Sequence, residues 1–251
     1  MRITLITVCY NSAAHIADTL RSVDAQTWPD IEHLIIDGAS RDDTLAIVAA
    51  HPQPWRRVLS EPDKGIYDAM NKGLRLASGE LVGFLNADDF LADPEAVARI
   101  ARAAEQGADA VYGDLVYVAE HDTARVVRHW VSGDYAPARL ARGWMPPHPT
   151  FYARRALFER LGGFDTRYRI AADYDLMMRL LTRGQARLAY VPEVQIRMRT
   201  GGASNRSLAN LWRKSLEDLH IMRKHGVGGL ATLLLKNLIK LPQFLLRNAA
   251  Q

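Results

Sequence analysis

The sequence has 251 residues, 48% of them hydrophobic and 24% charged, which excludes a disordered chain and allows one large α/β domain or two small ones. Its formal net charge of +4 suits a phosphorylated ligand, an anionic membrane surface or nucleic acid, and equally a mildly basic surface that binds none of them. The single cysteine, Cys9, excludes an internal disulfide and fits a reducing compartment.

The first 100 residues alternate apolar runs, which predict strands, with helix-spaced apolar residues, which predict helices. This alternation predicts a parallel sheet covered by helices. In chain order we expect a strand at 3–8, a helix around 16–23, a strand at 31–36, a helix to residue 48 opened by a capping box of Ser40 and Asp43, a strand at 57–60, a helix around 66–74, a strand at 81–85 and a helix starting at Asp93-Pro94.

The second half is less regular, and no linker divides it into independent domains. Here we expect a strand at 110–112, a hairpin of 116–118 with 126–131, a proline-rich loop at 146–149, a helix at 154–161, a helix at 174–181 that begins at Asp173, and a strand ending at Gly201-Gly202.

Polar residues follow the predicted strands where ligands of parallel sheets bind, beyond the carboxyl ends. After the first strand the chain reads Cys9-Tyr10-Asn11-Ser12, without a glycine-rich phosphate loop. A dinucleotide-binding dehydrogenase and a P-loop enzyme are therefore disfavoured. If a diphosphate binds here, a cation must supply much of the countercharge.

Asp88-Asp89, after the predicted strand 81–85, is the first candidate to hold that cation, because Mg²⁺ prefers carboxylate and phosphate oxygens. A turn with a helix cap is the alternative. Asp37 poses a similar choice between a turn residue and a hydrogen-bond acceptor for a base. Tyr10 either stacks on that base or fills the core.

Asp173 is either the N-cap of its helix or a general base. His148 either lines an acceptor site or is an exposed loop residue. Arg197 and Arg199 either assist at a phosphate or belong to a solvated strand face.

Six segments of this chain occur in an order that resembles the family 2 inverting glycosyltransferases of the GT-A fold. The match covers roughly residues 1–205. The segments are Thr7-Val8-Cys9-Tyr10-Asn11, residues 36–44 (IDGASRDDT), residues 63–73 (DKGIYDAMNKG), Asn86-Ala87-Asp88-Asp89, Gly162-Gly163-Phe164-Asp165 and Ala172-Asp173-Tyr174-Asp175-Leu176.

The resemblance implies a Rossmann-like, mostly parallel sheet flanked by helices, with a nucleotide-sugar half at 1–90 and an acceptor half at 91–205. It implies transfer of a sugar from a UDP- or GDP-linked donor with inversion, Asp88 holding Mn²⁺ or Mg²⁺ and Asp173 as the base. The other expected donor contacts are Thr7, Tyr10, Asn11, Asp37, Lys64, Gly65, Asn71 and Arg199, and the expected acceptor contacts are His148 and Asp175.

Two positions depart from the family pattern. Asn86 stands where the metal motif has its first carboxylate, and Ala172 stands where an acid precedes the catalytic aspartate. These departures keep open a catalytically silent domain that binds a nucleotide or a partner protein. A nucleic-acid binder is disfavoured, because no basic–aromatic nucleic-acid module is recognisable.

The segment 206–251 is expected to be helical, and its leucines with Lys236, Lys240 and Arg247 suggest an amphipathic basic face. It either lies in a membrane interface or packs on the domain or on a second subunit. A membrane role would suit a lipid-linked saccharide acceptor. No run of 18 apolar residues and no signal peptide is found, so we expect a cytoplasmic protein, peripheral on the inner face of the membrane if the tail binds there.

Overall fold

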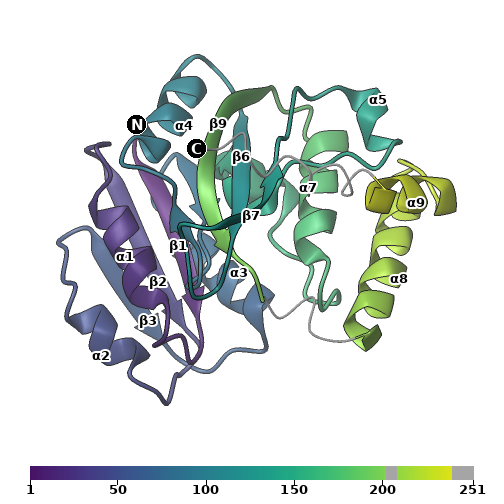
Figure 1. Cartoon of the computed structure of the whole chain (residues 1–251). Helices are drawn as coiled ribbons and strands as arrows, with labels where there is room; N and C mark the ends of the chain where they lie inside the picture. The colour runs from purple at the N-terminus through teal and green to yellow at the C-terminus, as the bar shows by residue number, and fades with distance from the viewer. Residues whose placement is uncertain (202–207, 239–251) are drawn as a thin grey trace.

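The computed structural model describes residues 1–201 and 208–238. Within these ranges one mixed β-sheet runs through the centre of the molecule (Figure 1), in the order β3-β2-β1-β4-β8-β6-β9-β5, with β7 paired to β6. The strands are β1 (Ile3–Cys9), β2 (Ile31–Asp37), β3 (Arg56–Ser60), β4 (Leu81–Phe84), β5 (Phe90–Leu91), β6 (Ala110–Val118), β7 (Val126–Trp130), β8 (Tyr152–Arg154) and β9 (Leu188–Arg199).

The N-terminal half of the sheet is parallel, as the strand–helix alternation predicts: β3, β2, β1 and β4 run in one direction. The short strand β8 then inserts antiparallel between β4 and β6, and β6 and β9 are parallel again. The sequence does not reveal β8, because three residues are too few for a hydrophobic period. The sheet is therefore mostly, but not wholly, parallel.

Strand β6 joins two predicted strands into one. The break between them in the apolar pattern is Gly113-Asp114, where the register between β6 and β9 shifts. Such an irregularity re-aims the strand while pairing continues on both sides of it. The predicted hairpin with β7 is confirmed.

Helices cover both faces of the sheet. Alternate residues of β1 show the division: Ile3 and Leu5 pack with one set of helices, whereas Ile6 and Val8 pack with the other. The first set is α1 (Ile16–Asp24), α2 (Thr44–Ala49) and α4 (Ala96–Glu105), and the second is α3 (Ile66–Leu76), α6 (Arg155–Leu161) and α7 (Ala172–Thr182). A short helix α5 (Pro137–Leu140) and a 3₁₀ turn (His148–Thr150) lie between β7 and β8.

The predicted capping box before α2 is wrong. The Ser40 hydroxyl donates to Asp37 instead, and the Thr44 N–H is held by Asp42 Oδ1 at 3.1 Å. Asp43 makes no side-chain capping bond. The local pattern assigns Ser40 to the start of the helix, but in the structure Ser40 bonds to Asp37 at the end of β2.

The C-terminal helices α8 (Leu208–Lys224) and α9 (Leu230–Leu238) continue the fold. Ile221 and Met222 are buried in the core cluster that contains α7, and the Thr232 hydroxyl donates to the Ala141 carbonyl at 2.8 Å. The inner faces of both helices therefore pack on the domain, which is one of the two alternatives for this segment. Residues 239–251 of the expected tail lie outside the described residues. No helix among the described residues is long and apolar enough to span a membrane.

Candidate active site

A cleft of about 540 Å³ lies where the two halves of the sheet meet the C-terminal helices. It is lined by the start of α3, Asn86, the adjoining ends of β6, β7 and β9, the segment 143–149, the start of α7, and residues of α8 and α9. Three residues predicted to carry function line it: His148, Asp173 and Arg199. Side chains from distant parts of the sequence thus share one cavity.

Asp173 lies in the first turn of α7 with its carboxylate toward this cleft. It is not a side-chain N-cap, because no side-chain capping bond occurs at this helix and the cap position is Ala171. The Tyr67 hydroxyl, from α3, donates to the Ile170 carbonyl at 2.6 Å and lies 3.2 Å from Asp173 Oδ1. Burial, and then the nearby Asp173 charge, raise the pKa of Tyr67, so this phenol stays a hydrogen-bond donor.

His148 is not an exposed loop residue. Its ring stacks on Phe84 with centroids 5.5 Å apart and meets the edge of Phe164 at 5.8 Å. Its Nε2 is buried and has no hydrogen-bond partner among the described residues. Burial lowers the pKa of His148, and the charge of Asp173 opposes that shift. A neutral imidazole therefore lies near Asp173 at the wall of the cleft.

The loop after β4 separates its two aspartates. Asp89 is buried and braces the loop, receiving Asn86 Nδ2 at 3.1 Å and the Arg199 backbone N–H at 3.1 Å. Burial, and then the charge of Asp88, raise the pKa of Asp89 well above its ordinary value. Asp88 is half-buried, and no described residue donates to its carboxylate.

These contacts bear on a metal ion. The described residues contain no group of three or more His, Cys, Asp or Glu side chains able to hold one. Asp88 nevertheless has a half-buried carboxylate that no described residue contacts, and Mg²⁺ accepts such a carboxylate together with phosphate oxygens. Asp88 itself is not among the lining side chains of the cleft, although Asn86, two residues before it, is.

Arg199, predicted to assist at a phosphate, lines the cleft and also makes contacts within the protein. The guanidinium donates from Nη1 to the Asp88 carbonyl at 2.7 Å and from Nη2 to Asp18 of α1. It also covers the Phe90 ring, 5.1 Å from its centroid. With both terminal nitrogens engaged, Arg199 ties the end of β9 to the loop of Asp88. Its Nε is buried and has no hydrogen-bond partner among the described residues.

The carboxyl end of β2 holds Asp37 as a buried acceptor. Ser40 donates its backbone N–H at 3.0 Å and its hydroxyl, and Ser60 donates its hydroxyl at 2.6 Å. Burial alone would raise the pKa of Asp37, but these hydrogen bonds outweigh it and lower the pKa. The Cys9 thiol also donates to Asp37 at 3.6 Å, so this carboxylate connects the end of β1, the loop at Ser40 and the end of β3.

Those segments carry the other donor-side predictions. Asn11 adopts φ 49°, receives the Arg41 N–H on Oδ1 at 2.9 Å, and donates its own N–H to Ser40. Tyr10 is 59% exposed, so it does not fill the core. Lys64 is exposed, and Gly65 has φ 116°, open space where a Cβ would lie, and a place just before α3. These residues gather beyond the ends of β1 and β2, outside the lining of the 540 Å³ cleft.

Two predicted donor contacts point elsewhere. The Thr7 hydroxyl is fully buried and lies 2.9 Å from His33 Nε2, because an inner strand turns alternate side chains into the core. The Asn71 amide donates to the Phe164 carbonyl and accepts the Phe164 N–H, both at 2.8 Å. It locks α3 to the loop at Gly162-Gly163. Both side chains therefore make their contacts within the protein.

Asp175, the other predicted acceptor contact, makes its hydrogen bonds within the protein. It is fully buried and receives Arg179 Nε at 3.0 Å, Lys224 Nζ at 2.8 Å and His225 Nε2 at 2.9 Å. Burial would raise the pKa of Asp175, but the bonds from His225 and Lys224 outweigh it and lower the pKa. This carboxylate connects α7 to the end of α8.

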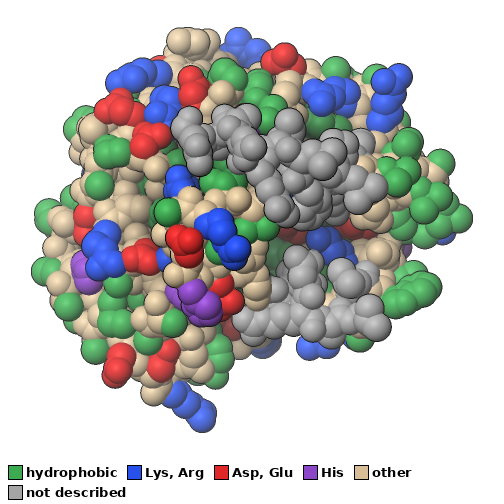
Figure 2. Space-filling view, in the orientation of Figure 1, with side chains coloured by type: hydrophobic (Ala, Val, Ile, Leu, Met, Phe, Trp, Pro, Cys, Tyr) green, Lys and Arg blue, Asp and Glu red, His purple; other side chains and the backbone are tan. Residues whose placement is uncertain are grey.

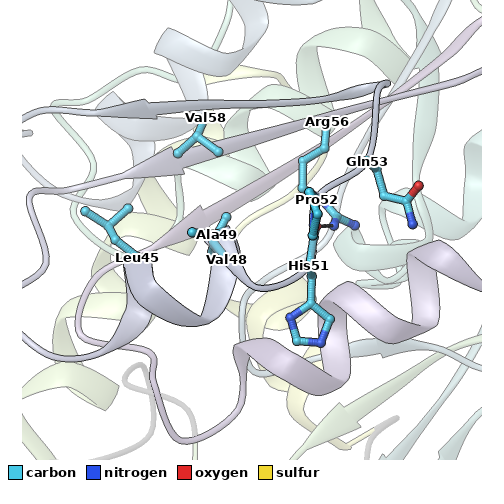
Figure 3. Close-up of a pocket in the computed structure, with 8 residues that line it drawn as sticks. All are labelled: Leu45, Val48, Ala49, His51, Pro52, Gln53, Arg56 and Val58. Atoms are coloured by element: carbon cyan, nitrogen blue, oxygen red, sulfur yellow. Dashed lines mark hydrogen bonds between the residues drawn. The ribbon is translucent and has the colours of Figure 1, made fainter.

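A second pocket, of about 350 Å³, lies between α2 and the edge strand β3 (Figure 3). Most of its lining side chains are apolar. Its one arginine, Arg56, is engaged by Asp24 at 2.6 Å, by His33 at 3.1 Å and by the His51 carbonyl. It contains none of the residues predicted to carry function.

Two contributors escape local sequence reasoning. Tyr67 belongs to a recognised segment, but its hydroxyl meets Asp173 only through the tertiary fold. Glu217 of α8 receives the backbone N–H groups of Arg169, Ile170 and Ala171, at 3.1, 3.0 and 2.9 Å. A glutamate on a polar helix has no sequence feature that would single it out.

Comparison with known proteins agrees with this arrangement. The family model "Glycosyl transferase family 2" matches residues 4–171. A PGL/p-HBAD biosynthesis glycosyltransferase of Mycobacterium tuberculosis is 34% identical over 181 residues, covering 70% of this chain and 68% of the relative. Chondroitin synthase of Escherichia coli is 30% identical over 192 residues, covering 71% of this chain and 27% of that protein.

Solved structures share the fold. S. aureus TarS 1–349 in complex with UDP-GlcNAc superposes with a TM-score of 0.66 at 19% identity, covering 90% of this chain and 66% of that one. The mannosyltransferase PcManGT from Pyrobaculum calidifontis, in complex with GDP-Man and Mn²⁺, superposes with a TM-score of 0.66 at 24% identity, covering 99% of this chain and 74% of that one. The chain therefore belongs to glycosyl transferase family 2 and has the GT-A fold.

Proposed function

We propose that this glycosyltransferase moves a sugar from a UDP- or GDP-linked donor to an acceptor hydroxyl with inversion, in the synthesis of a cell-surface polysaccharide. The observation that carries the proposal is Asp173, a carboxylate in the first turn of α7 that lines a 540 Å³ cleft together with Asn86 of the loop after β4. The relatives that carry UDP-GlcNAc and GDP-Man support the donor class.

The proposed reaction is one displacement that needs one base. Asp173 takes the proton of the acceptor hydroxyl, and that oxygen attacks the anomeric carbon. The bond from the anomeric carbon to the diphosphate oxygen breaks, and its electron pair leaves with the nucleoside diphosphate. Attack opposite the leaving group inverts the anomeric configuration. Tyr67, which donates to Ile170 and reaches Asp173, helps to hold the carboxylate in place.

Asp88 is the residue that would hold Mn²⁺ or Mg²⁺, because its carboxylate has no partner among the described residues. The cation would supply positive charge for the leaving diphosphate. Arg199 fixes the Asp88 backbone, and Asp37, Tyr10 and the segment at Lys64-Gly65 lie beyond the strand ends, where a nucleoside would bind.

The outer faces of α8 and α9 suit a membrane-bound acceptor. Figure 2 shows hydrophobic side chains gathered on the side of the molecule where these helices lie. Large apolar side chains are exposed there: Trp212, Leu216, Leu230, Leu234, Leu235 and Leu238, with exposed fractions from 42% to 72%. Such a surface fits the inner face of the cytoplasmic membrane, where a lipid-linked saccharide would be presented.

The transfer reaction is tested with UDP-, GDP-, CDP- and dTDP-sugars in Mn²⁺. The wild type is expected to be stabilised thermally by one donor class and to release nucleoside diphosphate from it. Asp173→Asn should keep the thermal shift and lose release by about 10² to 10⁴-fold, the usual share of a general base. Equal release by wild type and Asp173→Asn would overturn the assignment of the base. No thermal shift with any donor would overturn the donor class.

Membrane binding is tested by flotation with vesicles that contain anionic lipid. The pair Leu234→Ser and Leu238→Ser should reduce flotation, because both side chains are more than half exposed and their loss leaves the core intact. Val58→Ser, at an exposed apolar residue of β3, is the control. Flotation that is the same in all three proteins would contradict this surface.

A further inference from the structure

A buried ion pair closes the C-terminal wall of the cleft. Asp218 of α8 and Lys236 of α9 both line the cavity, with Oδ2 and Nζ 2.9 Å apart. Their side chains are only 5% and 9% exposed. Both lie beyond the 4–171 segment that the family model matches. The pair therefore belongs to the part of the wall that the C-terminal helices add.

This pair is incompletely satisfied. Asp218 Oδ1 is buried and accepts no hydrogen bond from any residue in the described ranges. Asp175, on the neighbouring helix, is by contrast a fully paired carboxylate, with three nitrogen partners across its two oxygens. A buried carboxylate oxygen without a hydrogen-bond donor is costly. A donor group on a bound ligand would therefore be favourable at Asp218, which lines the cavity.

The second partner lies on an aromatic ring. Lys236 Nζ lies 3.4 Å from the centroid of Tyr174, and the main chain of Lys236 packs closely against Gly143. Burial lowers the pKa of Lys236, and the charges of Asp218 and Asp173 oppose that shift. Trp130 and Trp144 line the same cavity. A carboxylate, an ammonium group and aromatic rings thus converge near the base.

A carbohydrate fits these groups. Its hydroxyls donate to a carboxylate and accept from an ammonium group, and its C–H faces lie against aromatic rings. Asp218 and Lys236 neutralise each other, so this ion pair by itself offers no net charge to an anion. We propose that Asp218 and Lys236 form a subsite for hydroxyl groups of a neutral saccharide acceptor, with Asp218 Oδ1 accepting one of them.

The subsite rests on the proposed transfer reaction, and the experiment separates the two. Binding of neutral methyl glycosides of glucose, galactose, mannose, rhamnose and N-acetylglucosamine is measured by saturation-transfer NMR. Inorganic phosphate and glucuronate are the anionic probes. Donor thermal shift and donor hydrolysis are recorded on the same preparations.

The wild type should bind at least one neutral glycoside. Asp218→Asn and Lys236→Met should each weaken that binding about tenfold or more, as expected for a lost charge-assisted hydrogen bond. The double variant Asp218→Asn/Lys236→Met removes both charges at similar volume, so it preserves folding where a single variant leaves one charge buried. Asp24→Asn, which breaks the partly buried pair with Arg56 outside the cleft, should bind as the wild type does.

The subsite is overturned if the double variant binds the glycoside as the wild type does, if only phosphate or glucuronate binds, or if no probe binds. Donor shift and hydrolysis that persist in those cases leave the transfer reaction standing. Asp218-dependent glycoside binding without any donor shift or hydrolysis would support the subsite and overturn the transfer reaction.

Discussion

The Glu217 carboxylate on α8 accepts the backbone N–H of Ala171 at 2.9 Å, two residues before Asp173 in α7. The same carboxylate holds the N–H groups of Arg169 and Ile170. The N-terminus of a helix leaves such donors without intrahelical partners, and an anion is favourable there. A helix beyond the matched family segment therefore positions the proposed base.

Replacing Glu217 should weaken catalysis and stability without weakening donor binding. Glu217→Ala leaves three N–H groups without their acceptor and should lower the melting temperature by several degrees, since each charge-assisted bond contributes on the order of 1.5–3 kcal/mol. We expect a fall of about tenfold in kcat with little change in the KM for donor, and partial rescue by Glu217→Gln. Glu159→Gln, which loses only an exposed pair with Arg155, is the control. A KM effect equal to the kcat effect would contradict the positioning role.

Asp175→Asn should be strongly destabilising. This change removes the charge and one of the two acceptor oxygens that Arg179, Lys224 and His225 share, at a cost of about 3–5 kcal/mol for a broken buried pair. Because the folded pKa of Asp175 is depressed, its contribution is present above the unfolded pKa of about 3.9 and is lost as the pH falls through the lower folded pKa.

Urea unfolding at pH 7 and below pH 4 tests this. The difference in free energy of unfolding between wild type and Asp175→Asn should be large at pH 7 and should shrink below pH 4. Asp30→Asn, at an exposed pair with Arg2, should change little at either pH. A difference that does not vary with pH would rule out the depressed pKa as its source.

His33 predicts a second pH dependence, near neutrality. It is fully buried, and burial, followed by the charge of Arg56, lowers its pKa well below the ordinary value. The unfolded chain takes up the proton first as the pH falls below about 6.5, so the stabilising contribution is present above that pH and is lost toward the folded pKa. The limiting slope is about 1.4 kcal/mol per pH unit.

We therefore expect the free energy of unfolding of the wild type to fall more steeply between pH 7 and 5.5 than that of His33→Gln. His121→Gln, at an exposed residue, should keep the wild-type slope. Parallel slopes for wild type and His33→Gln would show that His33 becomes protonated in the folded protein.

Asp88 should decide the metal dependence. Chelation with EDTA is expected to abolish the thermal shift caused by a nucleotide sugar, and Mn²⁺ or Mg²⁺ should restore it. Asp88→Ala should lose the metal-dependent part of that shift while its melting temperature without ligand stays near that of the wild type, because its carboxylate has no described partner. Glu80→Ala is the control, because Glu80 is exposed and lies just before the first residue of β4, at the end of the strand away from Asp88. A full shift in chelator would eliminate the metal.

Asp88 and Asp89 show what local sequence patterns can and cannot predict about this site. The apolar run before them correctly predicts a central strand, and that position singles out the pair. Which carboxylate faces outward depends on Asn86 and Arg199, the latter 110 residues from Asp89 in the chain, so no local pattern contains the answer. Arg199 and Asn71 show the same limit, since their types suit phosphate or sugar but their contacts lie within the protein.

The sequence by itself determined the strand–helix order of the N-terminal half, the polar residues at its strand ends and the ordered segments of the family, because these depend on local hydrophobic period and residue type. The tertiary structure alone decided which polar side chains became partners of one another. It buried Thr7 and Asp175, brought Tyr67 to Asp173, and set Asp218 and Lys236 in the cleft wall. The physical reason is that burial and pairing depend on neighbours distant in the chain, which set the cost of leaving a polar group unsatisfied.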